Sequence, residues 1–185
     1  HRLEMGGGVA IPLSSEHRAI YGTGAAFTFG YAARISSGDS WFVLDVGLVR
    51  GAGAEYFPDP TFEMDDASYW LVPIHFGLRT NVISPERRQH VNLYLGLAFE
   101  SMLTRWREPF GETFGTPTFG FNLELRPEIP LGDTWSLWLR QRISVVDGVR
   151  YEGRGGELNY SSGQLQLGVG YALQSGAARL ERGAR

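Results

Sequence analysis

Apolar side chains alternate with small, polar or charged ones through most of this 185-residue chain. The segment 116–131, TPTFGFNLELRPEIPL, shows the alternation most clearly. Its odd positions are largely Phe, Leu and Ile, and its even positions include Gly120, Asn122, Glu124 and Arg126. A β-strand sends successive side chains to opposite faces, so this segment has one apolar face and one polar face. The pattern predicts a strand.

The same alternation recurs along the whole chain. We predict eight strands, at residues 1–13, 21–35, 41–51, 68–82, 90–104, 116–131, 135–146 and 158–173. An even number of strands can close on itself, and closure removes exposed strand edges. Each segment is long enough for a tilted crossing of a bilayer. The sequence therefore predicts an all-β protein: an eight-stranded, antiparallel, up-and-down transmembrane β-barrel.

The predicted connections alternate in length. Short turns at 36–40, 83–89 and 132–133 lie on one side, and longer links at 52–67, 105–115 and 147–157 lie on the other. The link 14–19 belongs to the second group but is short. Short periplasmic turns and long external loops are typical of outer-membrane barrels. We therefore expect a bacterial outer-membrane location, with extracellular long loops and periplasmic termini.

The apolar face is predicted to point outward, toward lipid. A ring of Phe and Leu from eight strands would overfill a small barrel, whereas Gly, Ala and a few long polar groups would fill it. Five aromatic residues near the predicted strand ends fit the girdles at a membrane interface. They are Trp70, Trp106, Phe119, Trp135 and Tyr171.

Composition narrows the possible functions. The net charge of -3 and the pI of about 5.8 give no indication of nucleic-acid binding. The absence of cysteine excludes disulfides and thiolate metal sites. We predict no cofactor and no metal, and we expect outer-membrane lipid as the surroundings of the barrel.

In strand count, alternation and loop asymmetry, residues 1–173 resemble the small eight-stranded outer-membrane barrels of the OmpA/OmpX type. The resemblance implies the architecture. It does not imply a specific activity, because no diagnostic motif carries it. Such barrels commonly end on an aromatic residue, whereas here Tyr171 and Leu173 are followed by residues 174–185. We assign these twelve residues to a polar tail outside the barrel.

Charged side chains on the inward face are expected to pair, because an unpaired buried charge is costly. The predicted ion-pair network comprises Asp45, His75, Arg79, Glu100, Glu124, Arg126, Glu128, Arg140 and Arg142. A two-residue loop at Gly132 and Asp133 would pair odd with even positions, so a three-residue connection, often with a bulge, is expected. One such register places Glu124 opposite Arg140, and the neighbouring register places it opposite Arg142. The favoured interpretation is a plug that fills the barrel, and the alternative is a proton or ion path.

Pro73 lies in the middle of a predicted strand, where it removes a backbone donor, so we expect a local bulge there.

Catalysis has weak support. His75 has no second His or Cys at ligand spacing, and no strand face brings a hydroxyl, an imidazole and a carboxylate together. A lipid-modifying barrel enzyme and a narrow channel remain alternatives, and a soluble ligand-carrying barrel is a more remote one. We predict that the protein is not an enzyme.

The long links hold two further candidate sites. The acidic residues Asp59, Glu63, Asp65 and Asp66 lack the fixed Gly-containing spacing of a calcium loop, so a solvated loop is favoured. Exposed aromatic clusters mark contact surfaces. The candidate surface is Tyr56, Phe57, Phe62, Trp106, Phe110 and Phe114, which alternatively pack on one another or dip into lipid. We expect a structural, anchoring or partner-binding protein whose loops contact other outer-membrane or surface proteins.

Overall fold

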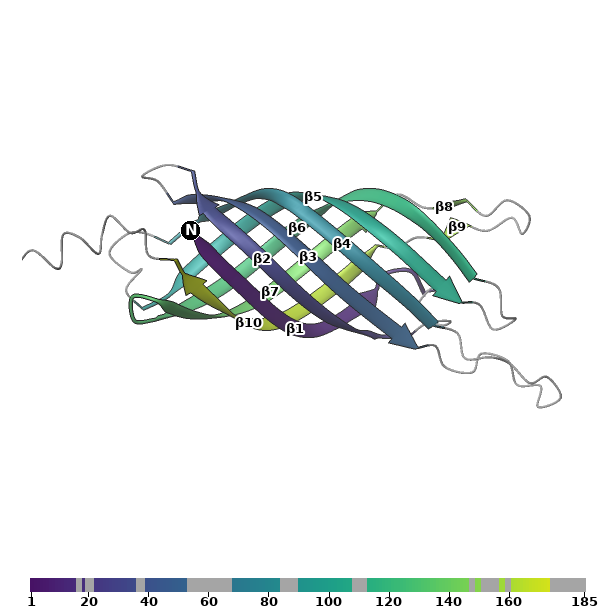
Figure 1. Cartoon of the computed structure of the whole chain (residues 1–185), viewed down its shortest axis with the longest axis horizontal. Coiled ribbons are helices and arrows are strands. Elements are labelled where there is room, and N and C mark those ends of the chain that lie inside the picture. Colours follow the sequence, from purple (N-terminus) through teal and green to yellow (C-terminus); the bar gives the residue numbers. More distant parts are fainter. Residues whose placement is uncertain are drawn as a thin grey trace, which may run out of the picture.

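The computed structural model describes residues 1–15, 18, 22–35, 39–52, 68–83, 90–107, 113–146, 149–150, 157–158 and 161–173. Eight strands close into one barrel in the order β1-β10-β7-β6-β5-β4-β3-β2 (Figure 1). Every neighbouring pair is antiparallel. The barrel strands are β1 (Arg2–Pro12), β2 (Gly24–Arg34), β3 (Ser40–Ala52), β4 (Ser68–Asn81), β5 (Asn92–Arg107), β6 (Thr113–Leu131), β7 (Trp135–Val146) and β10 (Ser162–Ala172).

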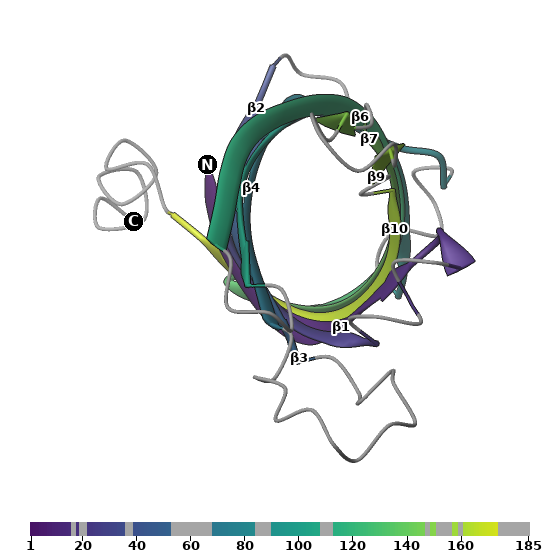
Figure 2. The same cartoon turned by 90° about the vertical axis from the view of Figure 1, so that its right-hand side faces the viewer.

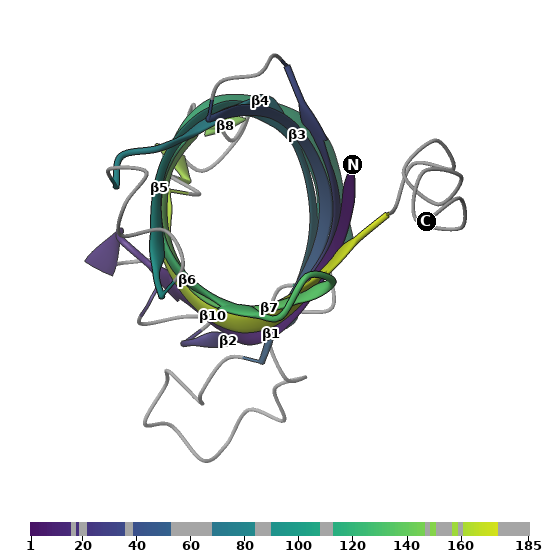
Figure 3. The same cartoon turned by 90° about the vertical axis from the view of Figure 1, so that its left-hand side faces the viewer.

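We call the end that carries the start of β1 and the β6–β7 turn the turn end, and the opposite end the loop end. Figure 2 looks into the loop end, and Figure 3 looks into the turn end. Both views show one continuous wall of strands. The predicted eight-stranded, closed, antiparallel barrel is therefore confirmed.

Three predicted boundaries at the loop end are wrong. The predicted link 105–115 is strand at both ends, because β5 and β6 continue to pair as far as Arg107 and Thr113. Residues 149–150 and 157–158 form β8 (Val149–Arg150) and β9 (Glu157–Leu158), a separate two-stranded sheet. The last barrel strand therefore begins at Ser162 and not at residue 158. Residues 174–185 are outside the described part of the chain, so the division into barrel and tail stays a prediction.

The β6–β7 turn settles the register between these strands. Leu131 pairs with Trp135, so the turn has three residues, Gly132 to Thr134, and not two. Gly132 has a φ of 75°, a backbone conformation that favours glycine. The resulting register pairs Glu124 with Arg142. The sequence alone left two registers open, with Glu124 opposite either Arg140 or Arg142.

The expected bulge at Pro73 is not present. Val46 pairs with Ile74 and Val49 pairs with Leu71, so the register of β3 against β4 is the same on both sides of the proline. Pro73 still pairs with Met102 on β5. Gly47 provides the space: a Cβ there would lie 2.8 Å from Pro73 Cγ. The small neighbour accommodates the ring without an inserted residue.

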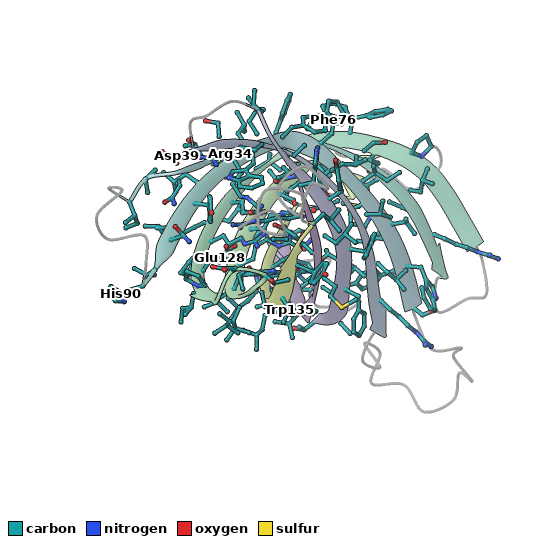
Figure 4. The ribbon with its side chains drawn as sticks, turned by 60° about the vertical axis from the view of Figure 1, so that its left-hand side comes forward. Arg34, Asp39, Phe76, His90, Glu128 and Trp135 are labelled. Atoms are coloured by element: carbon teal, nitrogen blue, oxygen red, sulfur yellow. The ribbon has the colours of Figure 1, made fainter. Side chains whose placement is uncertain are left out.

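The outer surface is apolar. Among the large exposed apolar side chains are Met5, Phe27, Leu97, Phe121, Leu123 and Leu167. Phe76 projects outward from the barrel wall, whereas Glu128 lies inside it (Figure 4). No helix in the described ranges has the length and apolar character needed to cross a membrane. The apolar side chains lie on the outside of the barrel and the charged ones lie inside, as predicted for the two faces of each strand.

The aromatic residues occupy two kinds of position. Trp135 and Tyr171 pair at the turn end with ring centroids 4.8 Å apart, and Trp70 lies near the loop end. The predicted position of Phe119 near a strand end is wrong. Because β6 starts at Thr113, Phe119 lies within the strand, and its ring packs on that of Phe99 with centroids 6.0 Å apart. The side chain of Trp106 is outside the described set.

Candidate functional site: the charged barrel interior

The barrel interior holds most of the buried charge in the described part of the chain. Its five buried carboxylates are Glu4, Asp45, Glu100, Glu124 and Glu128. Its four buried guanidinium groups are Arg79, Arg126, Arg140 and Arg142. Arg2 is partly exposed at the turn end and adds a fifth cation. Charges withdrawn from water need close partners, so the contacts among these groups decide whether the barrel is stable.

At the turn end, Glu4 is the central acceptor. Arg79 donates to both of its oxygens, from Nη1 at 3.0 Å and from Nη2 at 2.6 Å. Arg126 donates to Glu4 as well, and its other terminal nitrogen donates to Glu128 Oε2 at 2.7 Å. Arg2 Nη1 donates to Glu128 Oε1 at 2.7 Å. The five side chains form a chain of charge-assisted hydrogen bonds that spans the barrel end.

In the middle of the barrel, Arg142 and Arg140 bridge two carboxylates. Arg142 Nη2 donates to Asp45 Oδ2 at 2.6 Å and to Glu124 Oε2 at 2.8 Å. Arg140 Nη1 donates to Asp45 Oδ2 at 2.8 Å. Arg79 Nη1 lies 3.6 Å from Glu124 Oε1 and links this group to the turn-end group. The ion pairs therefore connect β3, β6 and β7 across the interior.

Toward the loop end the network changes character. Arg142 Nη1 lies 2.9 Å from His75 Nδ1. His75 Nε2 lies 3.4 Å from Glu100 Oε2, and both side chains are fully buried. Asn122 Nδ2 donates to the same Glu100 oxygen at 3.4 Å. Both contacts of Glu100, at 3.4 Å, are longer than the hydrogen bonds that arginines donate to the other four carboxylates, so Glu100 is held less tightly.

Trp138 fills much of the remaining interior. Its ring lies under two cations, with Arg126 Cζ 4.6 Å and Arg140 Cζ 5.0 Å from the ring centroid. Gly6 on β1 and Gly168 on β10 pair with each other, and a Cβ at either position would collide with the Trp138 ring. The glycines on the inward faces of β1 and β10 therefore provide room for one large aromatic residue.

All nine side chains predicted for the interior are buried, and each contacts at least one other member. The prediction missed three contributors: Glu4, Trp138 and Gln166. Gln166 accepts hydrogen bonds from Arg140 Nε at 3.0 Å and from Thr28 Oγ1 at 3.2 Å. Glu4 had a usable signal, because it shares the inward face of β1 with Gly6 and Gly8.

The candidate loop sites are not placed by the structure. Residues 53–67 and 108–112, which carry Tyr56, Phe57, Phe62, Phe110 and the acidic group, are outside the described residues. Trp106 and Phe114 pair through their backbones on β5 and β6, but their side chains are not described. The predicted contact surface and the solvated acidic loop therefore remain predictions.

Comparison with known proteins identifies the fold. No family model matches the sequence, and no curated protein sequence matches it. Neisserial surface protein A is similar in structure, with a TM-score of 0.67, 17% identity, and coverage of 93% of this chain and 96% of that chain. This is the fold of the small outer-membrane β-barrels.

Two further structures share this fold. Ail, the attachment invasion locus protein of Yersinia pestis, has a TM-score of 0.52 at 12% identity, covering 92% of this chain and 97% of that chain. That structure is a complex with the heparin analogue sucrose octasulfate. A major outer membrane protein from Thermus thermophilus has a TM-score of 0.51 at 12% identity, covering 92% of this chain and 99% of that chain.

Proposed function

We propose that this protein is an outer-membrane barrel that is filled by its own side chains and that presents long extracellular loops to a protein partner. The carrying observation is the distribution of side chains on the wall: exposed apolar residues cover its outside, and charged residues fill its inside. An apolar surface of this kind is rarely exposed to water, whereas it is favourable in contact with the hydrocarbon of a bilayer. A closed barrel also leaves no unpaired strand edge in lipid.

The interior supports a structural role rather than transport. Arg–carboxylate contacts extend from Arg2 and Glu128 at the turn end to Arg142 in the middle, and Trp138 occupies the space between two of the arginines. An eight-stranded barrel is wide enough only for its own side chains. The contacts of His75 do not favour an enzyme either, because its buried ring lies between Arg142 and Glu100 and away from the lipid-facing surface.

The proposed orientation places the loop end outside the cell and the turn end in the periplasm. The native chain has no cysteine, so single cysteines report their own accessibility. We expect a membrane-impermeant maleimide to label Asp59→Cys on intact cells, and to label Asp133→Cys in the turn only after the outer membrane is permeabilised. If Asp133→Cys is labelled on intact cells and Asp59→Cys is not, the orientation of the barrel is the opposite of the one proposed. The cysteine-free parent is the background control.

The partner is proposed to be a protein because aromatic residues gather in the link 53–67 and in the segment 105–115, where β5 ends and β6 begins. The likeness to Ail supports a binding role for a surface barrel in general. It does not extend to a polyanion here, because the link 53–67 carries Glu55, Asp59, Glu63, Asp65 and Asp66 and would repel one.

The test is the native mass of the protein after extraction from its own membrane in mild detergent. We expect a defined complex larger than the 20.5 kDa chain with its detergent. We expect the Trp106→Ala, Phe110→Ala variant to run as the free barrel, because interface aromatics carry a large share of binding energy. Phe121→Ala is the matched control, since it removes an exposed aromatic from the barrel wall and should leave the complex intact. A parent protein that already runs as a free barrel would refute the partner-binding role.

A further inference from the structure

The buried charges of the described interior do not balance evenly along the barrel. Glu4, Asp45, Glu124 and Glu128 each form an ion pair with at least one arginine at 2.8 Å or closer. Glu100 does not. Within the described residues its ion-pair contact is to His75 alone, at 3.4 Å, although the side chain is 0% exposed. It is the one buried carboxylate in the described interior without a guanidinium partner.

His75 does not supply the missing charge in this arrangement. Arg142 is a donor only, and its Nη1 lies 2.9 Å from His75 Nδ1 and 3.3 Å from His75 Nε2, so we assign the nearer nitrogen, Nδ1, as the acceptor. The ring proton is then on Nε2, where it faces Glu100. An imidazole with one ring proton is neutral. The negative charge of Glu100 is therefore left without a full positive charge beside it.

Three buried oxygen atoms on β5, β6 and β7 lack a hydrogen-bond partner in the described structure. They are Glu100 Oε1, Thr118 Oγ1 and Ser144 Oγ. Thr118 is 4% exposed and Ser144 is 0% exposed. Orphaned polar atoms at this depth are uncommon, and each one requires an explanation such as a bound ion or water.

The strand register places these three residues at nearby inward positions on adjacent strands. Glu100 on β5 pairs with Gly120 on β6, and Thr118 and Asn122 are the inward neighbours of Gly120 on the same strand. Ser144 on β7 pairs with Asn122, and its hydroxyl interacts with the Glu100 carboxylate without reaching the geometry of a full hydrogen bond. Gly120 contributes no side chain between the inward positions of Thr118 and Asn122.

We propose that Glu100, Thr118 and Ser144 form a binding site for one small monovalent cation of the Na⁺ class. One carboxylate and two hydroxyls are hard oxygen ligands, which suit a hard cation. A single positive charge beside Glu100 compensates its local negative charge. The five carboxylates and five arginines of the interior already balance in total, so a monovalent ion adds less net charge to the low-dielectric interior than a divalent ion would. Water completes the coordination shell.

The test measures thermal unfolding of the detergent-solubilised, full-length protein by circular dichroism. Samples in NaCl and in N-methylglucamine chloride at equal ionic strength are compared, because the larger organic cation does not fit among three side-chain oxygens. A cation that binds only the folded state raises the midpoint. We expect the midpoint to rise with the logarithm of the Na⁺ concentration, by roughly 3–6 °C at ten times the dissociation constant. Line broadening of ²³Na⁺ in nuclear magnetic resonance reports the binding directly.

Two kinds of variant identify the site. Glu100→Gln keeps the shape but removes the charge, so it should abolish both the Na⁺-dependent rise and the line broadening, and raise the midpoint in N-methylglucamine chloride. Thr118→Val and Ser144→Ala retain the carboxylate and should each weaken Na⁺ binding about tenfold, a loss of one ligand. Glu128→Gln is the matched control. It removes a carboxylate that two arginines already hold, so it should lower the midpoint in both salts and preserve the difference between them.

Equal midpoints in the two salts, together with unbroadened ²³Na⁺ resonances, would overturn the proposal and would mean that Glu100 carries a proton instead. A Glu100→Gln protein that still responds to Na⁺ would also overturn it, because the ion would then bind elsewhere. If Glu100→Gln does not fold, the hydroxyl variants decide between the same two results. None of these outcomes depends on the orientation of the barrel or on a protein partner.

Discussion

Replacing Arg142 with methionine is expected to lower the free energy of unfolding by about 3–5 kcal/mol. Methionine keeps much of the volume but removes the donor shared by Asp45, Glu124 and His75. Two fully desolvated carboxylates then lose their closest cation, although Arg140 still reaches Asp45. Urea-induced unfolding from lipid vesicles, followed by tryptophan fluorescence, measures the change.

Gln141→Met is the matched control for this prediction. Gln141 precedes Arg142 on β7, but its side chain is exposed on the outer wall. Its replacement should change the free energy of unfolding by no more than about 0.5 kcal/mol. A loss below about 1 kcal/mol for Arg142→Met would contradict the view that the interior ion pairs hold the strands together.

Placing an arginine at Leu123 is expected to cost about 2–4 kcal/mol of folding free energy in a bilayer. Leu123 is 62% exposed on the outer wall and lies in the interior of β6, well after its start at Thr113. It pairs with Leu97 on β5 and Ile143 on β7, which are also exposed and apolar. A guanidinium at this position therefore faces the hydrocarbon. Refolding into lipid vesicles and titration with urea give the difference.

Leu131→Arg provides the comparison on the same strand and the same face. Leu131 is the last residue of β6 at the turn end, where headgroups and water are within reach of a long side chain. The cost there should fall to about 0–1 kcal/mol. Equal costs at the two positions would mean that the apolar wall is not buried in a bilayer, and would count against the proposed location.

The faces of the barrel were predictable because they depend on a local rule. Alternation with a period of two assigns each residue to the inside or the outside once the strand is known, and one bulky apolar set cannot fit a small interior. For that reason Asp45, His75 and Arg126 were assigned inward from the sequence alone. Boundaries were less predictable, since β5 and β6 continue into a segment whose composition indicated a loop.

Pro73 shows where local reasoning fails. The missing donor was visible in the sequence, but its remedy was not, because the residue that accommodates the ring is Gly47 on the neighbouring strand. Glu124 was similar. Its two possible partners are two residues apart on β7, and only the three-residue turn at Gly132 distinguished them.

The sequence by itself determined the strand count, the inward and outward faces and the set of charges that share the interior, because each of these follows from the order of residues along one strand. The tertiary structure alone decided which charges meet. Asp45 and Arg140 lie on β3 and β7, which are not neighbours, and their contact depends on how far each strand is shifted against the next as the barrel closes. That cumulative shift pairs Glu4 with Arg79 and Arg126 and leaves Glu100 without an arginine.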